Sequence, residues 1–264
     1  MASVKEIRGF FEQRVPSYLK LDFDNVGMLV GFCDAEVRTV LTALDITDAV
    51  IEEAADIGAQ LIVSHHPLLF DPLKRVTDDD PTGSKVIRLI QNGISAICLH
   101  TNLDTVDGGV NDCLMEALGG RVTGLMDPHG AHPDGTPYGI GRIGELPAPV
   151  GLEDFLLRTK QRLHCSGLRY VDGGKPVHFL ACCGGAGGSD MWKAVAAGCD
   201  TYVTADVKYD VFLCAKELGL NLIDADHFCT ENVVVPHLKR LLCENFPELD
   251  VRISKVHRQT ISFI

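Results

Sequence analysis

The sequence predicts an α/β protein made of two α/β domains, with mostly parallel or mixed sheets and a metal site in the cleft between them. Two observations lead to this prediction. Short runs of Val, Ile and Leu alternate with segments of helical periodicity, as in parallel sheets covered by helices. Three of these runs, 61–63, 94–99 and 220–223, are followed by polar clusters, which contain two histidines after the first run and histidine together with carboxylate residues after the other two. Because ligands of open α/β sheets lie beyond the carboxyl ends of the strands, these clusters indicate a binding site there.

The expected elements follow from apolar spacing and from residues that begin or end helices. Val4, Ile7, Phe10 and Phe11 have helical spacing, and Pro16 stops that helix. Helices are expected at 4–13, 47–57, 83–91, 108–118, 151–162, 189–197, 207–217 and 229–244. Strands are expected at 38–45, 60–64, 94–99, 138–145, 167–171, 177–183, 200–204 and 220–224, with terminal strands at 251–253 and 260–264.

The expected domain boundaries rest on a change of composition. The stretch 127–137 is dense in Gly and Pro, which is typical of a linker or an excursion. The third polar cluster lies far along the chain, so it joins the first two only if the chain returns to the first sheet. We therefore expect residues 1–126 and 225–264 to form a first domain that carries the metal ligands. Residues 127–224 would form a second, inserted domain, with the site between the two.

Composition limits the classes of partner. The chain has 264 residues and a net charge of −12, which disfavours binding to a nucleic-acid backbone. No apolar run approaches the roughly 20 residues that span a bilayer, and the N-terminus lacks the apolar region of a signal peptide. A cytoplasmic location without a membrane partner is the resulting expectation. The ten cysteines contain no C-x-x-C pair, so most are expected to be small buried hydrophobes.

The first two clusters offer histidines and one carboxylate. His65 and His66 are adjacent at a strand end, so they can serve two metals; the alternative is a pair of structural loop histidines. Asp104 can supply an oxygen ligand, or it can cap a turn. His100 suits an orienting role better than direct ligation.

The third cluster places His227 and Glu231 four residues apart, on one face of a helix. Glu231 is a natural bridging ligand between two cations, or else a carboxylate that stabilises a helix start. Two divalent ions (zinc, iron or manganese) would lower the pKa of a shared water, which is hydrolytic chemistry. Glu231 and His100 are the residues that could assist that water. Cys229 lies between the two ligands and could be sensitive to oxidation.

A glycine-rich turn at 183–190 follows the expected strand 177–183 and opens a helix. Its backbone amides could hold an anion such as a substrate phosphate, or the glycines could simply permit a tight turn. Asp206 and Lys208, after the next strand, could line the same cleft, or could be a helix cap and an exposed lysine. The candidate substrate-binding residues are thus Gly184, Gly185, Gly187, Gly188, Asp206 and Lys208.

These motifs, in this order along the chain, resemble those of the NGG-interacting-factor-three-like proteins, which are also called GTP cyclohydrolase I type 2 homologues. The matching segments are 24–27, 64–70, 100–104, 183–188, 204–206 and 224–227 with Glu231. The resemblance implies a dinuclear site of His65, His66, Asp104, His227 and Glu231, two α/β domains and a ring-shaped homohexamer. It also implies GTP cyclohydrolase activity in some members, in which metal-activated water attacks the purine C8. Ala205 departs from the family, which usually has glycine there.

Two functions follow as hypotheses. The first is a dinuclear metal-dependent hydrolase that acts on a nucleotide-like or phosphorylated small molecule, with GTP cyclohydrolase-type ring opening as its specific form. The alternative is a non-catalytic metal-binding adaptor or metal-handling protein, which is favoured by the lack of an obvious general base beyond the ligands.

Overall fold

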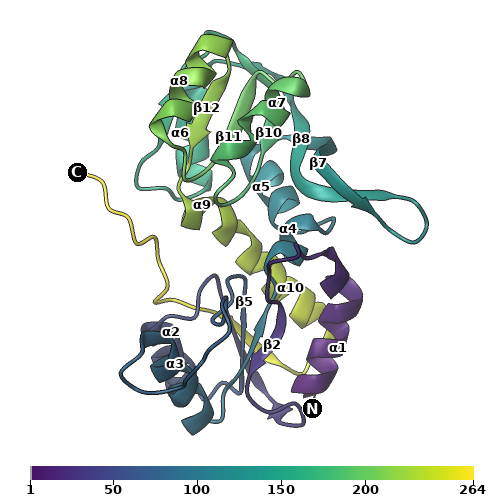
Figure 1. Cartoon of the computed structure of the whole chain (residues 1–264), viewed down its shortest axis with the longest axis vertical. Helices are drawn as coiled ribbons and strands as arrows, with labels where there is room; N and C mark the ends of the chain where they lie inside the picture. The colour runs from purple at the N-terminus through teal and green to yellow at the C-terminus, as the bar shows by residue number, and fades with distance from the viewer. Residues whose placement is uncertain (1) are drawn as a thin grey trace. The chain divides into compact units, whose positions relative to one another are not determined.

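The computed structural model describes residues 2–264, and the chain forms two compact units (Figure 1). The first comprises the chain up to Leu103 together with Val235–Arg258, and the second comprises Asp104–Val234 with Gln259–Ile264. Each unit has a β-sheet covered by helices. The predicted α/β class with mixed sheets is confirmed.

The sheet of the first unit has five strands in the order β13-β4-β5-β6-β2. Strands β13, β4, β5 and β6 run parallel, and β2 pairs antiparallel with β6 at the edge. The bounds are β13 (Asp250–Ile253), β4 (Thr39–Ala43), β5 (Leu61–Ser64), β6 (Ser95–Cys98) and β2 (Gly27–Val30). A separate antiparallel pair joins β1 (Ala2–Ser3) to β3 (Glu36–Val37). The three central strands are buried throughout or nearly so, which explains why their residues are mostly apolar.

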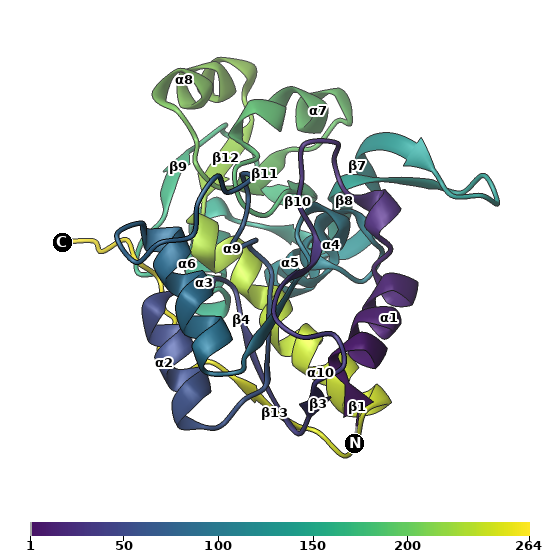
Figure 2. The same ribbon diagram turned by 60° about the horizontal axis from the view of Figure 1, so that its bottom comes forward.

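Helices cover this sheet on both sides (Figures 1 and 2). On one face α2 (Asp48–Asp56) and α3 (Pro81–Gln91) pack in a single core with strand residues such as Leu41 and Ile62. Helices α1 (Val4–Arg14) and α10 (Val235–Asn245) lie on the other side. Helix α1 begins with a capping box in which Ser3 and Glu6 satisfy each other's backbone amides, so its start is set locally.

The sheet of the second unit has six strands in the order β7-β8-β10-β11-β12-β9. Only the central strands β10, β11 and β12 are parallel. The bounds are β7 (Arg121–Ala131), β8 (Pro137–Val150), β10 (Val177–Cys182), β11 (Thr201–Thr204), β12 (Asn221–Asp224) and β9 (Arg169–Val171). Of the two alternatives for 127–137, a linker or an excursion, the structure shows an excursion, because this stretch forms the end of the β7–β8 hairpin. Gly135 turns there with φ +87°, and the amide of His132 donates to Thr136 O.

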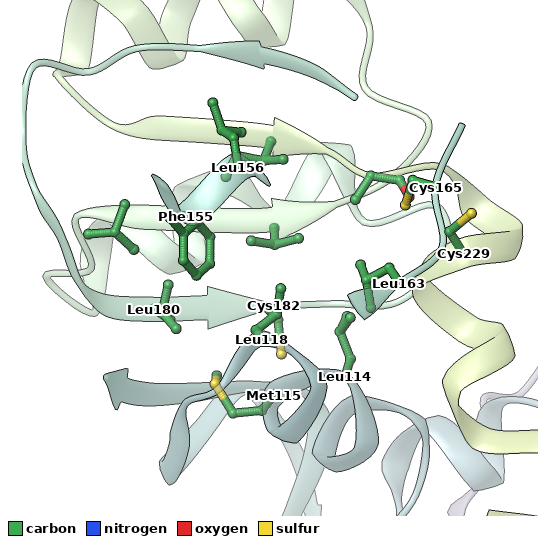
Figure 3. Packing of buried hydrophobic residues seen from close by; sticks show 14 of the residues in the cluster. Leu114, Met115, Leu118, Phe155, Leu156, Leu163, Cys165, Leu180, Cys182 and Cys229 are labelled. Carbon is green, nitrogen blue, oxygen red and sulfur yellow. The ribbon is translucent and has the colours of Figure 1, made fainter. Parts of the chain in front are cut away.

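Successive residues of these parallel strands enter two different cores. Leu180 and Cys182 face α5 (Val110–Leu118) and α6 (Leu152–Arg162), as Figure 3 shows. Ala181 faces α7 (Met191–Ala196) and α8 (Tyr209–Leu218) on the opposite side. Cys182 acts here as a small apolar residue, and burial raises the pKa of its thiol to about 12. Most cysteines are buried or partly buried as expected, whereas Cys33 and Cys243 are exposed.

The bounds of the units differ from the predicted domain boundaries. Residues 104–126 and 225–234 belong to the second unit, because Leu114 of α5 and Cys229 of α9 (His227–Glu231) share a core with Phe155. The expected helix 229–244 is broken after α9 by a 3₁₀ turn, Asn232–Val234, and resumes as α10 in the first unit.

The end of the chain also differs from the prediction. The strand expected at 260–264 does not form, and no partner strand lies beside this segment within the described residues. Instead Gln259 accepts a hydrogen bond from the amide of Ser166, and the Phe263 ring lies against Gly167. Among residues 2–264, no helix has both the length and the apolar composition needed to cross a membrane.

Candidate metal centre

The histidines of the first two polar clusters come together in the first unit. His65 and His66 follow β5, and His100 follows β6, which is the neighbouring parallel strand. Nitrogen atoms of the three rings lie within 4.8 Å of one another, and His65 is fully buried. Parallel neighbours end at the same edge of a sheet, so the pairing of β5 with β6 brings these side chains together.

Each of these imidazoles is held through its Nδ1 atom. That atom of His65 lies 2.8 Å from Leu99 O, and that of His100 lies 2.8 Å from Asp24 Oδ1. The Nδ1 of His66 lies 2.7 Å from Asp45 Oδ1. An acceptor at Nδ1 selects the tautomer whose Nε2 carries the lone pair, which is the arrangement of metal-binding histidines.

Two carboxylates that sequence reasoning missed organise this cluster. Asp24 is buried, and it accepts hydrogen bonds from the backbone amide and the hydroxyl of Thr101 as well as from His100. Burial by itself raises the pKa of Asp24, but these hydrogen bonds outweigh it and hold the pKa well below its ordinary value. Asp24 belongs to the segment 24–27 that the family resemblance had marked without a role.

Asp45 bridges two histidines that are far apart in the sequence. Its Oδ2 lies 2.7 Å from Nε2 of His257, while its Oδ1 holds His66. The tail that carries His257 is fixed by Ser254, whose hydroxyl donates to Glu53 and accepts from the His257 amide. Burial raises the pKa of Asp45, yet the two imidazoles outweigh it, so the carboxylate stays ionised. No local sequence signal marks His257.

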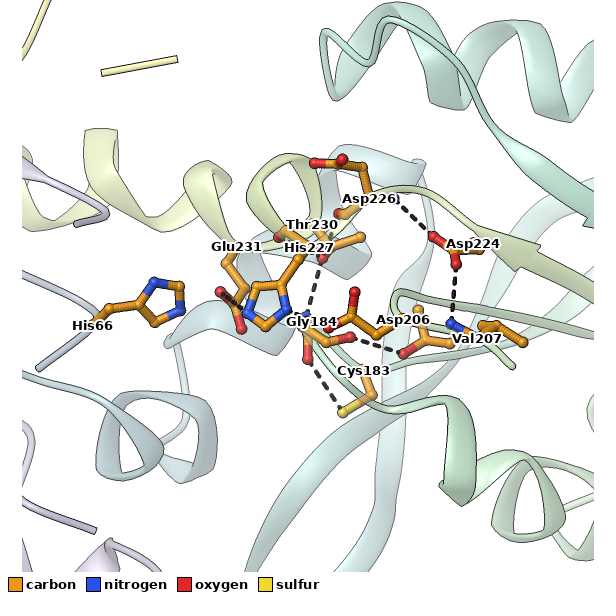
Figure 4. Close-up of polar contacts among 12 residues, drawn as sticks. His66, Cys183, Gly184, Asp206, Val207, Asp224, Asp226, His227, Thr230 and Glu231 are labelled. Carbon is orange, nitrogen blue, oxygen red and sulfur yellow. Dashed lines mark hydrogen bonds and ion pairs between the residues drawn. The ribbon is translucent and has the colours of Figure 1, made fainter. Parts of the chain in front are cut away.

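The second unit brings His227 and Glu231 together on α9, as Figure 4 shows. The Nε2 atom of His227 lies 3.1 Å from Oε2 of Glu231, which is buried. The Nδ1 atom of His227 lies 2.8 Å from Asp206 Oδ2. Asp206 therefore orients the His227 imidazole through Nδ1, as Asp45 orients that of His66. This role differs from the two that were predicted for Asp206, a substrate contact or a helix cap.

The two aspartates around His227 adopt backbone conformations that are unusual for their residue type. Asp206 has φ +53° and Asp226 has φ +68°, both in the left-handed region. Asp226 starts α9 by accepting from the amide of Cys229 at 3.2 Å. Asp224 holds both turns, since its carboxylate accepts from the amides of Val207 and Asp226. Such strain persists where surrounding contacts enforce it, and it is common at functional sites.

Asp104 lies on the short helix α4 (Thr101–Thr105) and is also buried. The side-chain amide of Asn111 donates to Asp104 O and accepts from the amide of Gly184, each at 2.9 Å. Asn111 thus ties Asp104 to the glycine-rich turn. Arg142 holds the next residues by donating to the carbonyls of Thr105 and Val106.

Backbone amides of the glycine-rich turn donate hydrogen bonds to other groups of the chain. The amides of Gly184, Gly185 and Gly187 donate to Asn111, Thr230 and Gly185 O, respectively. A Cβ atom at Gly185 would lie only 2.1 Å from Oε1 of Glu231. The glycines therefore let the turn approach Glu231 closely, which favours the tight-turn alternative for these three residues.

The remaining predicted residues near this turn have varied surroundings. Gly188 packs near Val207, and Lys208 is exposed. Cys229 is buried; its contact with Cys165 and its burial both raise the pKa of its thiol, which opposes oxidation. Ala205 is also buried, and its amide donates to Gly185 O.

The donor chemistry fits a metal. Each unit presents imidazole nitrogens or carboxylate oxygens, the ligands that zinc, iron and manganese accept, and four imidazoles have an acceptor at Nδ1. Fold and donor set together define an α/β protein with candidate histidine–carboxylate metal ligands. The sequence model described as Duf34/NIF3 (NGG1p interacting factor 3) matches residues 2–260, and the chain belongs to this family.

Relatives and solved structures agree with this assignment. The GTP cyclohydrolase 1 type 2 homolog of Clostridium perfringens is 35% identical over 263 residues, which cover 99% of each chain. A Bacillus cereus protein related to NIF3 superposes with a TM-score of 0.92 at 28% identity, covering 100% of this chain and 99% of that one. Reduced HcgD from Methanocaldococcus jannaschii gives a TM-score of 0.79 at 30% identity, covering 96% and 98%.

Proposed function

We propose that this protein is a dinuclear divalent-metal-dependent hydrolase that acts on a nucleotide-like or phosphorylated small molecule. The observation that carries the proposal is the repeated orientation of imidazoles by acceptors at Nδ1, in both units. The proposed ligands of the two ions, which are zinc, iron or manganese, are His65, His66, Asp104, His227 and Glu231. GTP cyclohydrolase-type ring opening is the specific reaction to test first, because curated relatives carry that name.

The residues have separate tasks in this proposal. Two divalent cations, when bound there, would lower the pKa of a coordinated water and so supply a nucleophile. Asp45 and Asp206 keep the imidazoles of His66 and His227 in position. Glu231 is the proposed bridging carboxylate. Lys208 is exposed and cationic, so it suits a substrate phosphate.

One observation favours the alternative of a non-catalytic metal-binding adaptor or metal-handling protein. The amides of Gly184, Gly185 and Gly187, which were predicted to hold a substrate anion, already donate within the chain. Fewer groups then remain for binding a phosphorylated substrate in this turn.

Turnover distinguishes the two functions. Protein loaded separately with zinc, iron(II) or manganese would be incubated with GTP and other nucleotides, and the products separated by chromatography, with Glu231→Gln as the control. The hydrolase proposal expects product formation that needs metal and is lost in the variant. Metal that passes to a partner protein, without turnover of any substrate, would support the adaptor. The proposed homohexamer is checked in the same samples by native mass spectrometry.

The His257→Ala variant is expected to bind metal more weakly than wild type, by roughly 10-fold, as for other residues that orient ligands. Without His257, Asp45 loses one of the two imidazoles that hold it, and His66 is less well oriented. The measurement is a zinc competition titration against a chromophoric chelator. His257→Gln, which keeps a donor, should restore part of the affinity, and His129→Ala on the exposed hairpin should change nothing. An unchanged affinity in His257→Ala would show that Asp45 needs no such support.

A further inference from the structure

Two exposed phenylalanine rings lie beside the histidine cluster of the first unit. The ring centroids of Phe23 and Phe70 are 6.1 Å apart, and Phe70 meets His100 edge-on with centroids 6.1 Å apart. The exposed fractions of Phe23 and Phe70 are 65% and 46%. The rings thus continue the cluster of three imidazoles outward, since the His66 and His100 centroids are 5.6 Å apart.

The loops that carry these rings are fixed to each other and to the cluster. The Asn25 side chain donates to Leu69 O at 2.6 Å, which joins the segment after Phe23 to the segment before Phe70. The neighbouring Asp24 holds His100. The position of both rings relative to His100 is therefore set by buried or short polar contacts, although the rings themselves face solvent.

The chemistry of this aromatic pair favours a flat ligand. The two ring planes are tilted by 55°, so the rings form a corner rather than a closed stack. Benzyl rings offer π-faces and no charge, so they attract a heteroaromatic base but not a phosphate. A ligand that reacts at the histidine cluster would bring its planar part next to Phe70.

We propose that Phe23 and Phe70 form a platform that binds the heteroaromatic base of the substrate. This inference rests on the proposed function and narrows it, because it selects nucleotides over phosphorylated molecules that lack an aromatic ring. Phe70, which lies against His100, makes the main contact with the base in this proposal, and Phe23 extends the platform away from the histidine cluster.

The test compares two probes that share a polyphosphate and differ in the base. Binding of GTP and of inorganic tripolyphosphate to metal-loaded protein would be measured by isothermal titration calorimetry. Phe70→Ala and Phe23→Ala are each expected to weaken GTP binding, Phe70→Ala by roughly tenfold or more, with tripolyphosphate binding unchanged. Phe70→Trp should retain GTP binding. Phe32→Ala, at a phenylalanine that is 50% exposed on the turn after β2, is the matched control and should bind both probes as wild type does.

The outcomes separate this inference from the proposed function. GTP binding that depends on Phe70 without any turnover supports the platform and contradicts the hydrolase. GTP turnover with equal GTP affinity in wild type and Phe70→Ala overturns the platform alone. Wild type that binds neither probe overturns both. Dissociation of an oligomer in both Phe70→Ala and Phe70→Trp, seen by native mass spectrometry, would assign the rings to a subunit interface and overturn the platform.

Discussion

The Gly185→Ala variant is expected to bind metal roughly 10- to 100-fold more weakly than wild type, the range seen when a residue that positions a ligand is changed. The added Cβ would lie 2.1 Å from Oε1 of Glu231 and 3.2 Å from Nε2 of His227. A distance of 2.1 Å is shorter than a non-bonded contact between carbon and oxygen allows, so the Glu231 carboxylate must move. The measurement is the zinc dissociation constant by chelator competition, with the melting temperature recorded alongside.

A matched control separates this collision from backbone strain. Gly58 has the same φ of +65° as Gly185, and a Cβ there would meet no atom within 4 Å. Gly58→Ala should therefore lose about 1–2 kcal/mol of stability from the left-handed conformation alone and keep the metal affinity of wild type. Equal metal affinity in Gly185→Ala and wild type would contradict the role of this glycine as a close neighbour of Glu231.

The Arg142→Met variant is expected to lower the free energy of unfolding by about 3–5 kcal/mol, the usual cost of removing one partner of a buried ion pair. Arg142 is 1% exposed, and its guanidinium donates to the Asp112 carboxylate and to backbone carbonyls that include Thr105 O and Gly139 O. The substitution leaves the buried carbonyls of Thr105 and Gly139 and the partly buried Asp112 carboxylate without their donor. Urea unfolding followed by circular dichroism measures the loss.

The pH dependence of this variant adds a second readout. Burial raises the pKa of Asp112, and Arg142 opposes that effect. Without the guanidinium the pKa rises further, and a carboxyl whose pKa is raised by folding favours the folded state while it is protonated. The loss of unfolding free energy in Arg142→Met, relative to wild type, should therefore become smaller as the pH falls through the raised pKa of Asp112. Arg121→Met removes an exposed ion pair with Glu145 and should cost about 0–1 kcal/mol at any pH. A loss of unfolding free energy as small as this in Arg142→Met would contradict the stabilising role of the buried Arg142 guanidinium.

The sequence predicts the elements that local patterns specify. The parallel strands that precede His65, His100 and His227 are buried and have apolar residues at their centres, and the candidate ligands follow their carboxyl ends as expected. The spacing of His227 and Glu231 predicts their contact, because residues four apart share a helix face. These features depend on neighbours in the chain and can be recognised without a fold.

Features that depend on distant residues could not be predicted in this way. Asp45 and His257 are joined only in the folded first unit, and nothing near His257 in the sequence distinguishes it from a surface histidine. The segment 127–137 has the Gly and Pro content of a linker, yet it pairs as a hairpin because the strand partners on both sides are long. The unit boundary at Leu103 follows from how α5 packs, which composition does not encode.

The most direct test of the central claim is elemental analysis of wild type, His66→Ala and Glu231→Gln, each purified without oxygen or chelator. His66 belongs to the first unit and Glu231 to the second. If the two sets of ligands hold one dinuclear centre, wild type should contain about two transition-metal ions per chain, and each variant should fall below about one. Wild type with well under one ion per chain after reconstitution, or a variant in either unit with the content of wild type, would contradict a shared centre.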